Sequence, residues 1–498
     1  MIFWRKIFRA PFWVPACLGL LVLAVAISSQ SIDMDEAQTW DYTRLSSVSQ
    51  VWNELRSDPN SESQMPLGMV AMWGWCRVWG TGEMASRAIN WAWAALALAS
   101  LCVVARETRM RWLPLLFALQ PFVWYSMDQA RTPLMQMAGG AMLLAGTVLL
   151  LNGSQRRFRV ILMLSVGSII LCGASMLGVI PLIVILVVLF TSAAWRRILW
   201  TRASKVVLFL TTAFLGALGF YYLSTLTRGA GGAKLWTVTP FNLVFVIYEF
   251  LGYAGLGPGR QQLRDIMRGA ESLSHVFPYG AGWIGLSVGY GLVVGAAVKS
   301  WFTRSECGPR KPALRLWLFC VSVPVLSALL LFLLASVVGF PFWGRHLAGT
   351  LPFAVTALAI VFYWSMQGLW RRAGRAGSLL VVLMLAISAG WMRFSPAHRH
   401  DDYRSAVRAA TSLADEGLSV WWVADHSGGE YYGLTFVESG SGVYFAFNHS
   451  QCPDVPPEAI VLSRPENFDR YGIAEKMIKS GEYQRSAKFQ AFDVWSRR

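Results

Sequence analysis

The chain has 498 residues, of which 55% are hydrophobic and only 14% are charged. Soluble domains usually carry about 25% charged residues, so this composition excludes an ordinary water-soluble protein and indicates a polytopic membrane protein. The formal net charge of +16 could suggest a nucleic-acid partner, but membrane topology also uses Lys and Arg. Because most basic residues fall in short connections between apolar runs, we expect no nucleic-acid partner.

Apolar runs recur along most of the chain, and a membrane-spanning helix needs about 20 such residues. The candidate spans are 12–28, 84–105, 113–126, 133–151, 160–177, 179–195, 206–223, 281–298, 316–340, 347–365 and 378–394. The predicted fold is therefore an all-α transmembrane domain over residues 1–394, with about eleven helices. Its two long outer loops are expected at 29–83 and 224–280.

Basic residues mark alternate connections between these runs. The clusters are Arg106, Arg109 and Arg111; Arg156, Arg157 and Arg159; Arg196, Arg197, Arg202 and Lys205; Lys299, Arg304, Arg310, Lys311 and Arg315; and Arg371, Arg372 and Arg375. Every cluster falls on the side of Arg5, Lys6 and Arg9, which the positive-inside rule assigns to the cytoplasm. The N-terminus is thus expected inside, and residues 395–498 outside.

Two further apolar segments would invert this pattern if they crossed the membrane. We expect 66–80 to lie along the outer surface, and 241–257 to be an interfacial or re-entrant piece of the second outer loop. The first run, 12–28, could alternatively be a signal peptide, but no convincing A-x-A cleavage site follows it. The parity of the basic clusters therefore decides the topology.

Residues 395–498 are expected to form a separate outer domain with a small α/β core. Residues 401–417 have helical spacing, 419–425 read as a strand, and 426–433 as a turn or loop. His398 and His400 precede two aspartates and could bind a metal, but a solvated linker is the simpler interpretation.

The predicted spans contain no acidic or basic residue at mid-depth, although ion-coupled carriers commonly keep ionisable residues there. The seven cysteines form no CxxC pair, and most lie in or beside apolar runs. We interpret them as packing residues and expect neither a disulfide framework nor a zinc site.

Acidic residues are concentrated just after the first apolar run. Asp33, Asp35 and Glu36 lie a few residues past the expected membrane edge, ahead of a helical pattern. A carboxylate at that position can be partly desolvated and act as a base. The later acidic residues are interpreted as parts of a solvated loop: Glu54, Asp58 and Glu62.

Three segments together resemble successive blocks of a known family: IDMDEAQTWDY at 32–42, QMPLGMVAMWGWCRVWGTGEMASRAINWAWAAL at 64–96, and PFVWYSMDQARTPLM at 121–135. In order and spacing they are similar to the GT-C glycosyltransferases that use polyprenyl-phosphate sugars. This group includes protein O-mannosyltransferases, lipid A aminoarabinose transferases and the RgtA/B/C/D-like bacterial group. The matching positions are Asp35-Glu36, Pro66-Leu67, Gly80 with Glu83 and Arg87, and Asp128 with Arg131.

The resemblance is strongest over residues 1–150. Later, GRHLAGTLPF at 344–353 resembles the family's Arg-Tyr near a late span, but here the pair is Arg345-His346. Met65 replaces a second proline, Thr132-Pro133 stand where an aromatic is common, and Asp128 replaces the more usual Glu. These departures concern the donor and acceptor contacts more than the fold.

The resemblance implies an inverting glycosyltransferase at the outer face of the bacterial cytoplasmic (inner) membrane. It would move a sugar from a polyprenyl-phosphate donor to the hydroxyl of a glycan, lipid or protein acceptor. Asp35 would be the general base, with Glu36 and Asp128 as further catalytic residues. The expected substrate-binding residues are Arg131 and Arg345, as phosphate partners, with His346 and Arg87.

Several alternatives stay open. Arg131 and Arg345 could be snorkelling residues or interfacial ion pairs. Asp128 could orient the acceptor, help to bind a divalent ion, or pair with Arg131, whereas Asp33 is expected to cap a helix. No cofactor is required, although a divalent cation is possible. A lipid-linked sugar flippase or transporter, or a non-enzymatic assembly factor of envelope polysaccharide, are the alternative functions.

Overall fold

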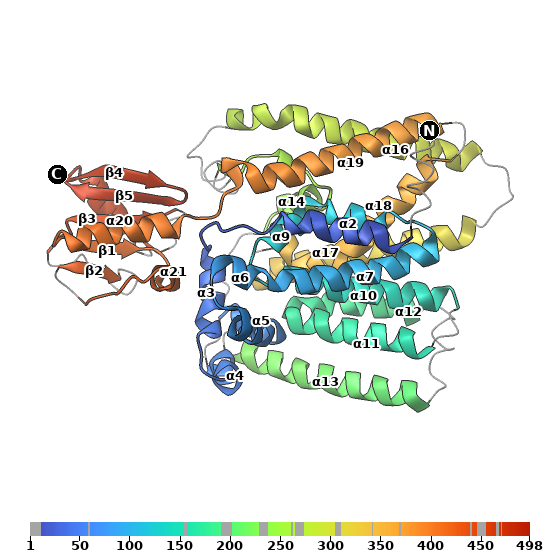
Figure 1. Cartoon of the computed structure of the whole chain (residues 1–498), viewed down its shortest axis with the longest axis horizontal. Coiled ribbons are helices and arrows are strands. Elements are labelled where there is room, and N and C mark those ends of the chain that lie inside the picture. Colours follow the sequence, from blue (N-terminus) through green and yellow to red (C-terminus); the bar gives the residue numbers. More distant parts are fainter. Residues whose placement is uncertain are drawn as a thin grey trace.

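A computed structural model describes residues 11–57, 60–153, 157–190, 202–228, 238–259, 262–263, 273–303, 310–340, 342–367, 370–438, 441–445, 455–464, 468–469 and 471–498. Long helices lie side by side in a bundle, and a small sheet with its own helices lies beyond one end of it (Figure 1). The predicted fold class, a helical membrane protein with a small C-terminal α/β part, is confirmed.

Among the described residues, eight helices are long and apolar enough to cross a membrane. They contain α7 (Ile89–Thr108), α10 (Pro133–Leu151), α11 (Arg157–Ala174), α13 (Arg202–Thr227), α16 (Gly280–Thr303), α17 (Arg310–Val338), α18 (Leu351–Ser365) and α19 (Arg371–Phe394). Three apolar helices are shorter: α2 (Trp13–Ala24), α12 (Val179–Phe190) and α14 (Pro240–Phe250). The predicted count of eleven spans is therefore not confirmed.

The expected span 113–126 is broken into two short helices, α8 (Leu113–Ala118) and α9 (Pro121–Met127). The break falls at Gln120, whose backbone is extended. A residue before proline avoids the helical region because the proline ring clashes with it, and proline fits the first turn of a new helix. Pro121 therefore restarts the chain as α9.

Helices outside the bundle gather at the end that faces the sheet. They are α3 (Met34–Thr43), α4 (Val48–Ser57), α5 (Pro66–Trp79) and α6 (Glu83–Arg87), with the short 3-10 helix η1 (Glu62–Gln64) (Figure 1). The segment predicted to lie along the outer surface, 66–80, is α5, and it packs on α3 and α4.

The opposite end of the bundle holds the described basic connections. There α7 and α16 end, and α11, α17 and α19 begin (Figure 1). The described members of the basic clusters thus share one end of the bundle, as the predicted topology requires. Arg5, Lys6, Arg9, Arg156, Arg196, Arg197 and Arg304 lie outside the described residues.

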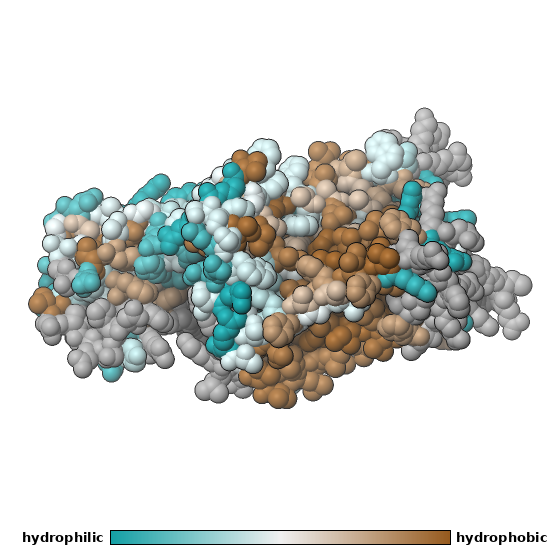
Figure 2. Space-filling view, turned by 90° about the horizontal axis from the view of Figure 1, so that it is seen from below, coloured by the Kyte–Doolittle hydropathy of each residue, from teal (hydrophilic) through white to brown (hydrophobic). Residues whose placement is uncertain are grey.

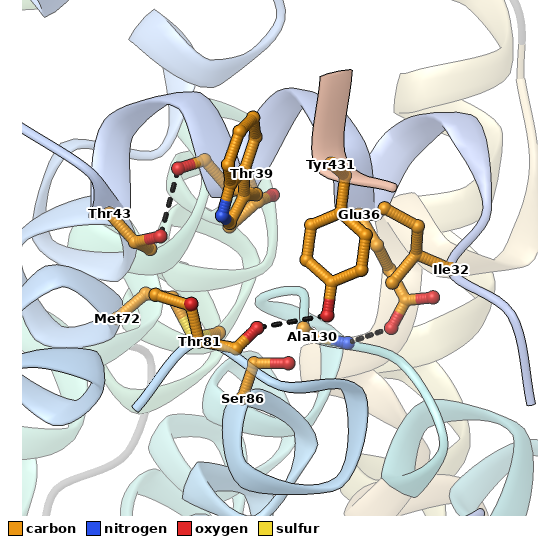
Figure 3. Close-up of a pocket in the computed structure, with 10 residues that line it drawn as sticks. Ile32, Glu36, Thr39, Thr43, Met72, Thr81, Ser86, Ala130 and Tyr431 are labelled. Carbon is orange, nitrogen blue, oxygen red and sulfur yellow. Dashed lines mark hydrogen bonds between the residues drawn. The ribbon is translucent and has the colours of Figure 1, made fainter. Parts of the chain in front are cut away.

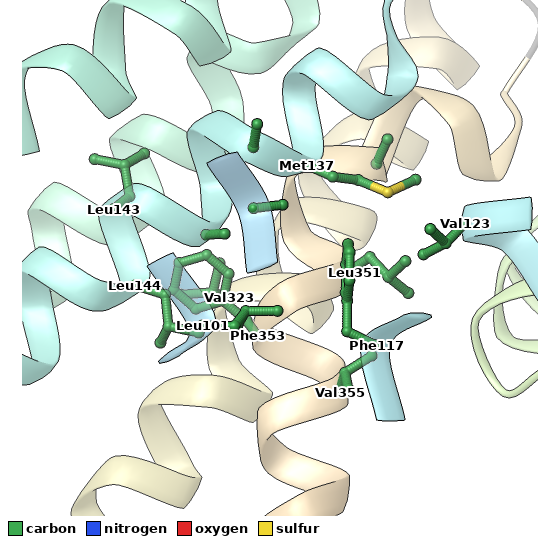
Figure 4. Packing of buried hydrophobic residues seen from close by; sticks show 14 of the residues in the cluster. Leu101, Phe117, Val123, Met137, Leu143, Leu144, Val323, Leu351, Phe353 and Val355 are labelled. Carbon is green, nitrogen blue, oxygen red and sulfur yellow. The ribbon is translucent and has the colours of Figure 1, made fainter. Parts of the chain in front are cut away.

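The centre of the bundle is built around α10, which is buried along almost its whole length. Met137 and Leu144 of α10 pack with Leu101 of α7 and Phe353 of α18 (Figure 4). Gly140 allows a close approach, because a Cβ added there would lie 1.9 Å from the carbonyl oxygen of Gly349. This contact holds the 3-10 helix η6 (Gly344–Thr350) against the bundle core.

The bundle's outer surface is apolar. Exposed hydrophobic side chains such as Phe209 and Phe220 on α13 form a band that gives way to polar residues toward the sheet (Figure 2). Such a surface needs a lipid environment, because contiguous exposed apolar area of this kind is unusual on a soluble protein.

The C-terminal sheet has the strand order β2-β1-β3-β5-β4. The strands are β1 (Ser419–Val423), β2 (Gly442–Phe445), β3 (Ala459–Ser463), β4 (Tyr483–Phe489) and β5 (Phe492–Arg497). β1 is parallel to β2 and β3, whereas β5 is antiparallel to β3 and β4. Trp421 and Trp422 are consecutive and both buried, so both faces of the sheet are covered.

Three helices accompany the sheet: α20 (Tyr403–Asp415), α21 (His426–Tyr431) and α22 (Ile473–Lys479). The predictions of a helix near 401–417 and a strand near 419–425 are confirmed. The prediction of a turn or loop at 426–433 is wrong, because Asp425 caps a short helix there by accepting a hydrogen bond from the Gly428 amide at 2.9 Å.

Candidate active site

The first turn of α3 carries the acidic residues that the sequence singled out. The Asp33 carboxylate accepts a hydrogen bond from the Glu36 amide at 2.9 Å, and the Glu36 carboxylate accepts one from the Asp33 amide at 3.1 Å. This reciprocal capping box satisfies amide donors that a helix start would otherwise leave without partners. Asp33 is therefore the helix cap, as expected, and it fixes Asp35 and Glu36 in the first turn.

Glu36 forms a fully buried ion pair with Arg87 at the end of α6. Both carboxylate oxygens are engaged, since Arg87 Nε lies 2.8 Å from Oε1 and Nη2 lies 2.7 Å from Oε2. Oε1 also accepts the Ala130 amide at 2.8 Å. Burial alone would raise the pKa of Glu36, but the charge and hydrogen bonds of Arg87 hold it well below its usual range.

The remaining Arg87 donors tie down the chain between α2 and α3. The guanidinium donates to the carbonyl oxygens of Ser28, Gln30 and Ser31 at 3.0–3.1 Å. Nη2 also lies 3.1 Å from Nδ1 of His400. Arg87 has zero solvent exposure, so in this state it joins parts of the protein and does not face an open site.

Asp128 lies beside the same arginine. Its carboxylate accepts hydrogen bonds from the Ser28 amide at 2.6 Å and the Ser28 hydroxyl at 2.7 Å. Arg87 Nη1 is 3.8 Å away and His400 Nε2 is 3.7 Å away. The sequence left open a pair between Asp128 and Arg131, but in the structure Arg131 binds other carboxylates.

Asp35 is one residue from Glu36 but is placed differently. Its carboxylate forms an ion pair with Arg345 through Oδ2, and Oδ1 lies 3.7 Å from Arg131 Nη2. The Asp35 side chain is 20% exposed, against 1% for Glu36. The structure therefore brings together three residues predicted from far-apart segments: Asp35, Arg131 and Arg345.

Arg131 is nearly buried and is held from several sides. It donates to the Asp35 carbonyl oxygen at 2.9 Å and to the Thr39 hydroxyl at 3.2 Å, and it forms an ion pair with Glu62. Burial alone would lower the pKa of Arg131, but the charges of Asp35 and Glu62 raise it above its ordinary value. The guanidinium therefore stays charged.

The position of Glu62 contradicts the interpretation made from the sequence. Glu62 is fully buried, and the Ser61 hydroxyl donates to it at 2.7 Å. Glu54 is exposed, as a solvated loop predicts, and Asp58 lies outside the described residues. Nothing in the local sequence distinguishes Glu62 from Glu54, because the partner of Glu62 is about seventy residues away at Arg131.

Arg345 and His346 lie in η6, at the boundary between the bundle and its polar end. The Arg345 side chain is 35% exposed, so it is the most accessible of the arginines in this cluster. The His346 ring accepts a hydrogen bond from the Trp343 amide through Nδ1 at 3.2 Å, which closes the turn. The sequence predicted both residues near the site, and Arg345 does reach Asp35.

His400 was interpreted as part of a solvated linker, and this interpretation is wrong. Its side chain is 8% exposed and lies between Glu36, Arg87 and Asp128. Burial alone would lower the pKa of His400, but the hydrogen bond and charge of Glu36 raise it above its usual value. His400 and Arg87 are more than three hundred residues apart in the sequence, so no local sequence pattern indicates this contact.

Asp33, Glu36 and His400 offer ligand atoms that all lie within 4.8 Å of one another, which is close enough for a metal ion. However, Gln129 Nε2 donates to Asp33 at 2.9 Å, and Arg87 already occupies both oxygens of Glu36. A guanidinium therefore supplies the positive charge that a metal would bring, and this cluster does not fit a divalent ion.

A narrow pocket lies beside this network, between α3, α5, the 81–86 segment and α21 (Figure 3). Thr39 and Thr43 of α3 line one wall, and Tyr431 of α21 closes it by donating a hydrogen bond to the Thr81 carbonyl oxygen at 3.0 Å. Trp40, also in the lining, packs edge to face against Tyr431 at 5.4 Å. The C-terminal part of the chain therefore supplies one side of this pocket.

No protein-family model and no curated protein matches the chain. Among solved structures, the apo ArnT from Cupriavidus metallidurans is 13% identical with a TM-score of 0.43, covering 99% of this chain and 97% of that one. The same protein bound to undecaprenyl phosphate is 12% identical with a TM-score of 0.44, covering 97% of each chain.

The arabinofuranosyltransferase AftD from Mycobacteria is 13% identical with a TM-score of 0.45 over 97% of this chain and 41% of that one. ArnT and AftD are both GT-C glycosyltransferases, the group that the sequence motifs resemble. Likenesses at this level of identity do not assign an activity, so the proposal below depends on the geometry of the site.

Proposed function

We propose that the chain is a membrane glycosyltransferase that moves a sugar from a polyprenyl-phosphate donor to an acceptor hydroxyl, with Asp35 as the general base. The observation that carries this proposal is the setting of Asp35. Its carboxylate is partly exposed and lies between Arg345 and Arg131, at the polar end of an apolar helix bundle. A base next to two phosphate-binding groups is the combination that this transfer needs.

The reaction follows from these groups. The acceptor oxygen attacks the anomeric carbon of the sugar from the face opposite the phosphate, and its proton passes to Asp35. The bond between the anomeric carbon and the phosphate oxygen breaks, and the electron pair leaves with the polyprenyl phosphate. One displacement inverts the anomeric configuration, and the arginines stabilise the charge that develops on the phosphate.

Arg345 is proposed as the main phosphate partner. It is more exposed than Arg131, and a guanidinium matches two phosphate oxygens at once. A donor phosphate would compete with Asp35 for Arg345, so donor binding would free the carboxylate that must accept the proton. His346, the next residue, is proposed as a further donor contact.

We assign Glu36, Arg87 and Asp128 to positioning, and Arg131 both to the phosphate and to positioning. Arg87 and Glu36 satisfy each other in a buried pair, and Asp128 fixes Ser28 beside them. Arg131 holds the Asp35 carbonyl and is itself neutralised in part by Glu62. These contacts keep the first turn of α3 in place while Asp35 loses its ion pair with Arg345 to the donor phosphate.

We further propose that the basic end of the bundle is cytoplasmic and that α3 and a domain of residues 395–498 lie outside the inner membrane of a bacterium. Arg372 and Ser412 are both exposed and belong to opposite ends of the molecule. In intact cells an impermeant thiol reagent should label Ser412→Cys but not Arg372→Cys. Labelling of both, or of Arg372→Cys alone, would contradict this orientation.

The decisive experiment compares envelope glycans by mass spectrometry in a deletion strain that is complemented with wild-type or variant protein. The wild-type chain should restore a sugar that the deletion strain lacks. Asp35→Asn keeps the side-chain shape but cannot accept the proton, so the rate of transfer should fall by about 10²–10⁴-fold and the sugar should not be restored to the wild-type level. Normal restoration by Asp35→Asn at matched expression would remove the base assignment and favour a carrier or assembly factor.

A further inference from the structure

We propose that Glu249, in the second outer loop, is the residue that positions Arg345 for the donor phosphate; this inference rests on the function proposed above. Glu249 lies near the end of α14, whose other residues are apolar or aromatic except for Asn242. Its place in the sequence indicates only an interfacial or re-entrant piece.

Two hydrogen bonds join α14 to the turn that carries Arg345. Glu249 Oε2 accepts the Gly344 amide at 3.0 Å, directly before Arg345. Asn242 Nδ2 donates to the Phe342 carbonyl oxygen at 3.1 Å, at the start of the same turn. The turn is thus held at two points, one through an acceptor and one through a donor.

The Asn242 contact is itself fixed by the start of α14. Asn242 Oδ1 accepts the Thr239 amide at 2.9 Å in a capping box, which leaves Nδ2 directed to the turn. The rings of Phe245 and Trp343 pack edge to face at 5.7 Å. One helix therefore contacts the turn through a polar residue at each end and an aromatic residue between them.

Gly344 permits the contact with Glu249. A Cβ added at Gly344 would lie 2.1 Å from Glu249 Oε2, so a larger residue would force the turn and the carboxylate apart. The close approach lets a side-chain oxygen of Glu249 accept a hydrogen bond from the Gly344 amide. The backbone next to Arg345 is thereby fixed, and the guanidinium reaches Asp35 from that fixed point.

The test uses two variants of the full-length protein in detergent. Glu249→Gln keeps an oxygen acceptor for the Gly344 amide, whereas Glu249→Leu removes it. Ile247→Leu, on the exposed side of the same helix, is the matched control. Amide hydrogen exchange of the peptide around Gly344 reports the contact itself, and the KM and kcat for a polyprenyl-phosphate sugar report its consequence.

Glu249→Leu should speed exchange at Gly344 and raise the donor KM about tenfold, with a smaller change in kcat, while Glu249→Gln and Ile247→Leu stay near wild type. Unchanged exchange or unchanged donor KM in Glu249→Leu would overturn the inference, as would a Gln variant as damaged as Leu. A wild-type protein that transfers no sugar would overturn the proposed function instead, and the exchange comparison would still decide the role of Glu249.

Discussion

Asp35 and Glu36 are consecutive residues of one helix turn, and both are paired with arginine, but their surroundings differ. Glu36 is sealed in the interior, where Arg87 and the Ala130 amide engage its oxygens. Asp35 is partly open, and its partner Arg345 is more exposed still. Buried ion pairs are costly to break, whereas an accessible pair can exchange one partner for another. The pair of Glu36 with Arg87 is suited to holding the helix, and the pair of Asp35 with Arg345 is suited to catalysis.

The largest effect should come from removing one arginine from each pair. Arg87→Met leaves Glu36 as a buried charge without its counter-ion, and such losses destabilise by about 3–5 kcal/mol. Arg345→Met should leave thermal stability nearly unchanged but sharply reduce use of the donor. Thermal unfolding in detergent and donor kinetics, measured on both variants, check the contrast.

Arg106→Met is a suitable control, because Arg106 forms an exposed pair with Glu107 and should change neither quantity. Equal destabilisation by Arg87→Met and Arg345→Met would break the distinction between the two pairs. Arg345→Lys should restore donor use only partly, since a point charge replaces a planar fork.

A second test extends the comparison to Asp425, a buried carboxyl group that accepts a hydrogen bond from the Gly428 amide. Burial and the nearby charge of Asp41 raise the pKa of Asp425 to about 7, from an ordinary value of 3.8. The folded state therefore holds the proton more tightly than the unfolded state. The resulting stability is present below about pH 4 and is lost as the pH rises toward 7, by at most about 1.4 kcal/mol per pH unit.

Asp425→Asn keeps the helix cap but does not titrate. Relative to wild type, this variant should therefore gain stability between pH 5 and pH 8. The difference between the two melting temperatures, followed across that range, isolates the group because other titrations are shared. A constant difference would show that Asp425 does not retain its proton.

The smallest effect is expected at Asp33, which caps the start of α3 and accepts a hydrogen bond from Gln129. Asp33→Asn should change stability by only a few tenths of a kcal/mol, and Asp33→Ala should cost about 1 kcal/mol, because alanine cannot accept the Glu36 amide. Sugar transfer should persist in both. If Asp33→Asn were inactive and Asp35→Asn active, the assignment of the base would be reversed.

Local features of the sequence predicted much of this architecture. Apolar runs and basic clusters identified the bundle and its two ends, and Asp33 was expected as a cap. The break at Gln120 could have been found from Pro121, but the apolar residues on both sides concealed it. The short helix at 426–431 was missed because two glycines hide the capping role of Asp425.

The partners of the site residues were harder to predict. Asp35, Arg131 and Arg345 were singled out together only through a resemblance to a family, and no periodicity in the chain joins them. Glu62 and His400 were misassigned because burial depends on residues brought close by the fold, namely Arg131 and Arg87. A charged residue in a polar segment reads as solvated until its distant partner is known.

The contact between Arg87 and His400 has a consequence for how the protein is made. The two residues are separated by 313 positions, so a ribosome has synthesised four fifths of the chain before the last member of the buried cluster exists. Helix α3 and Arg87 are synthesised early and lack this contact until His400 has been made. A nascent chain that stops after α19 would contain the first turn of α3 together with Arg87 and Arg345. It would lack His400, which lies against Glu36 and Asp128 in the complete site. The buried cluster can therefore close only after the segment that follows α19 has been synthesised.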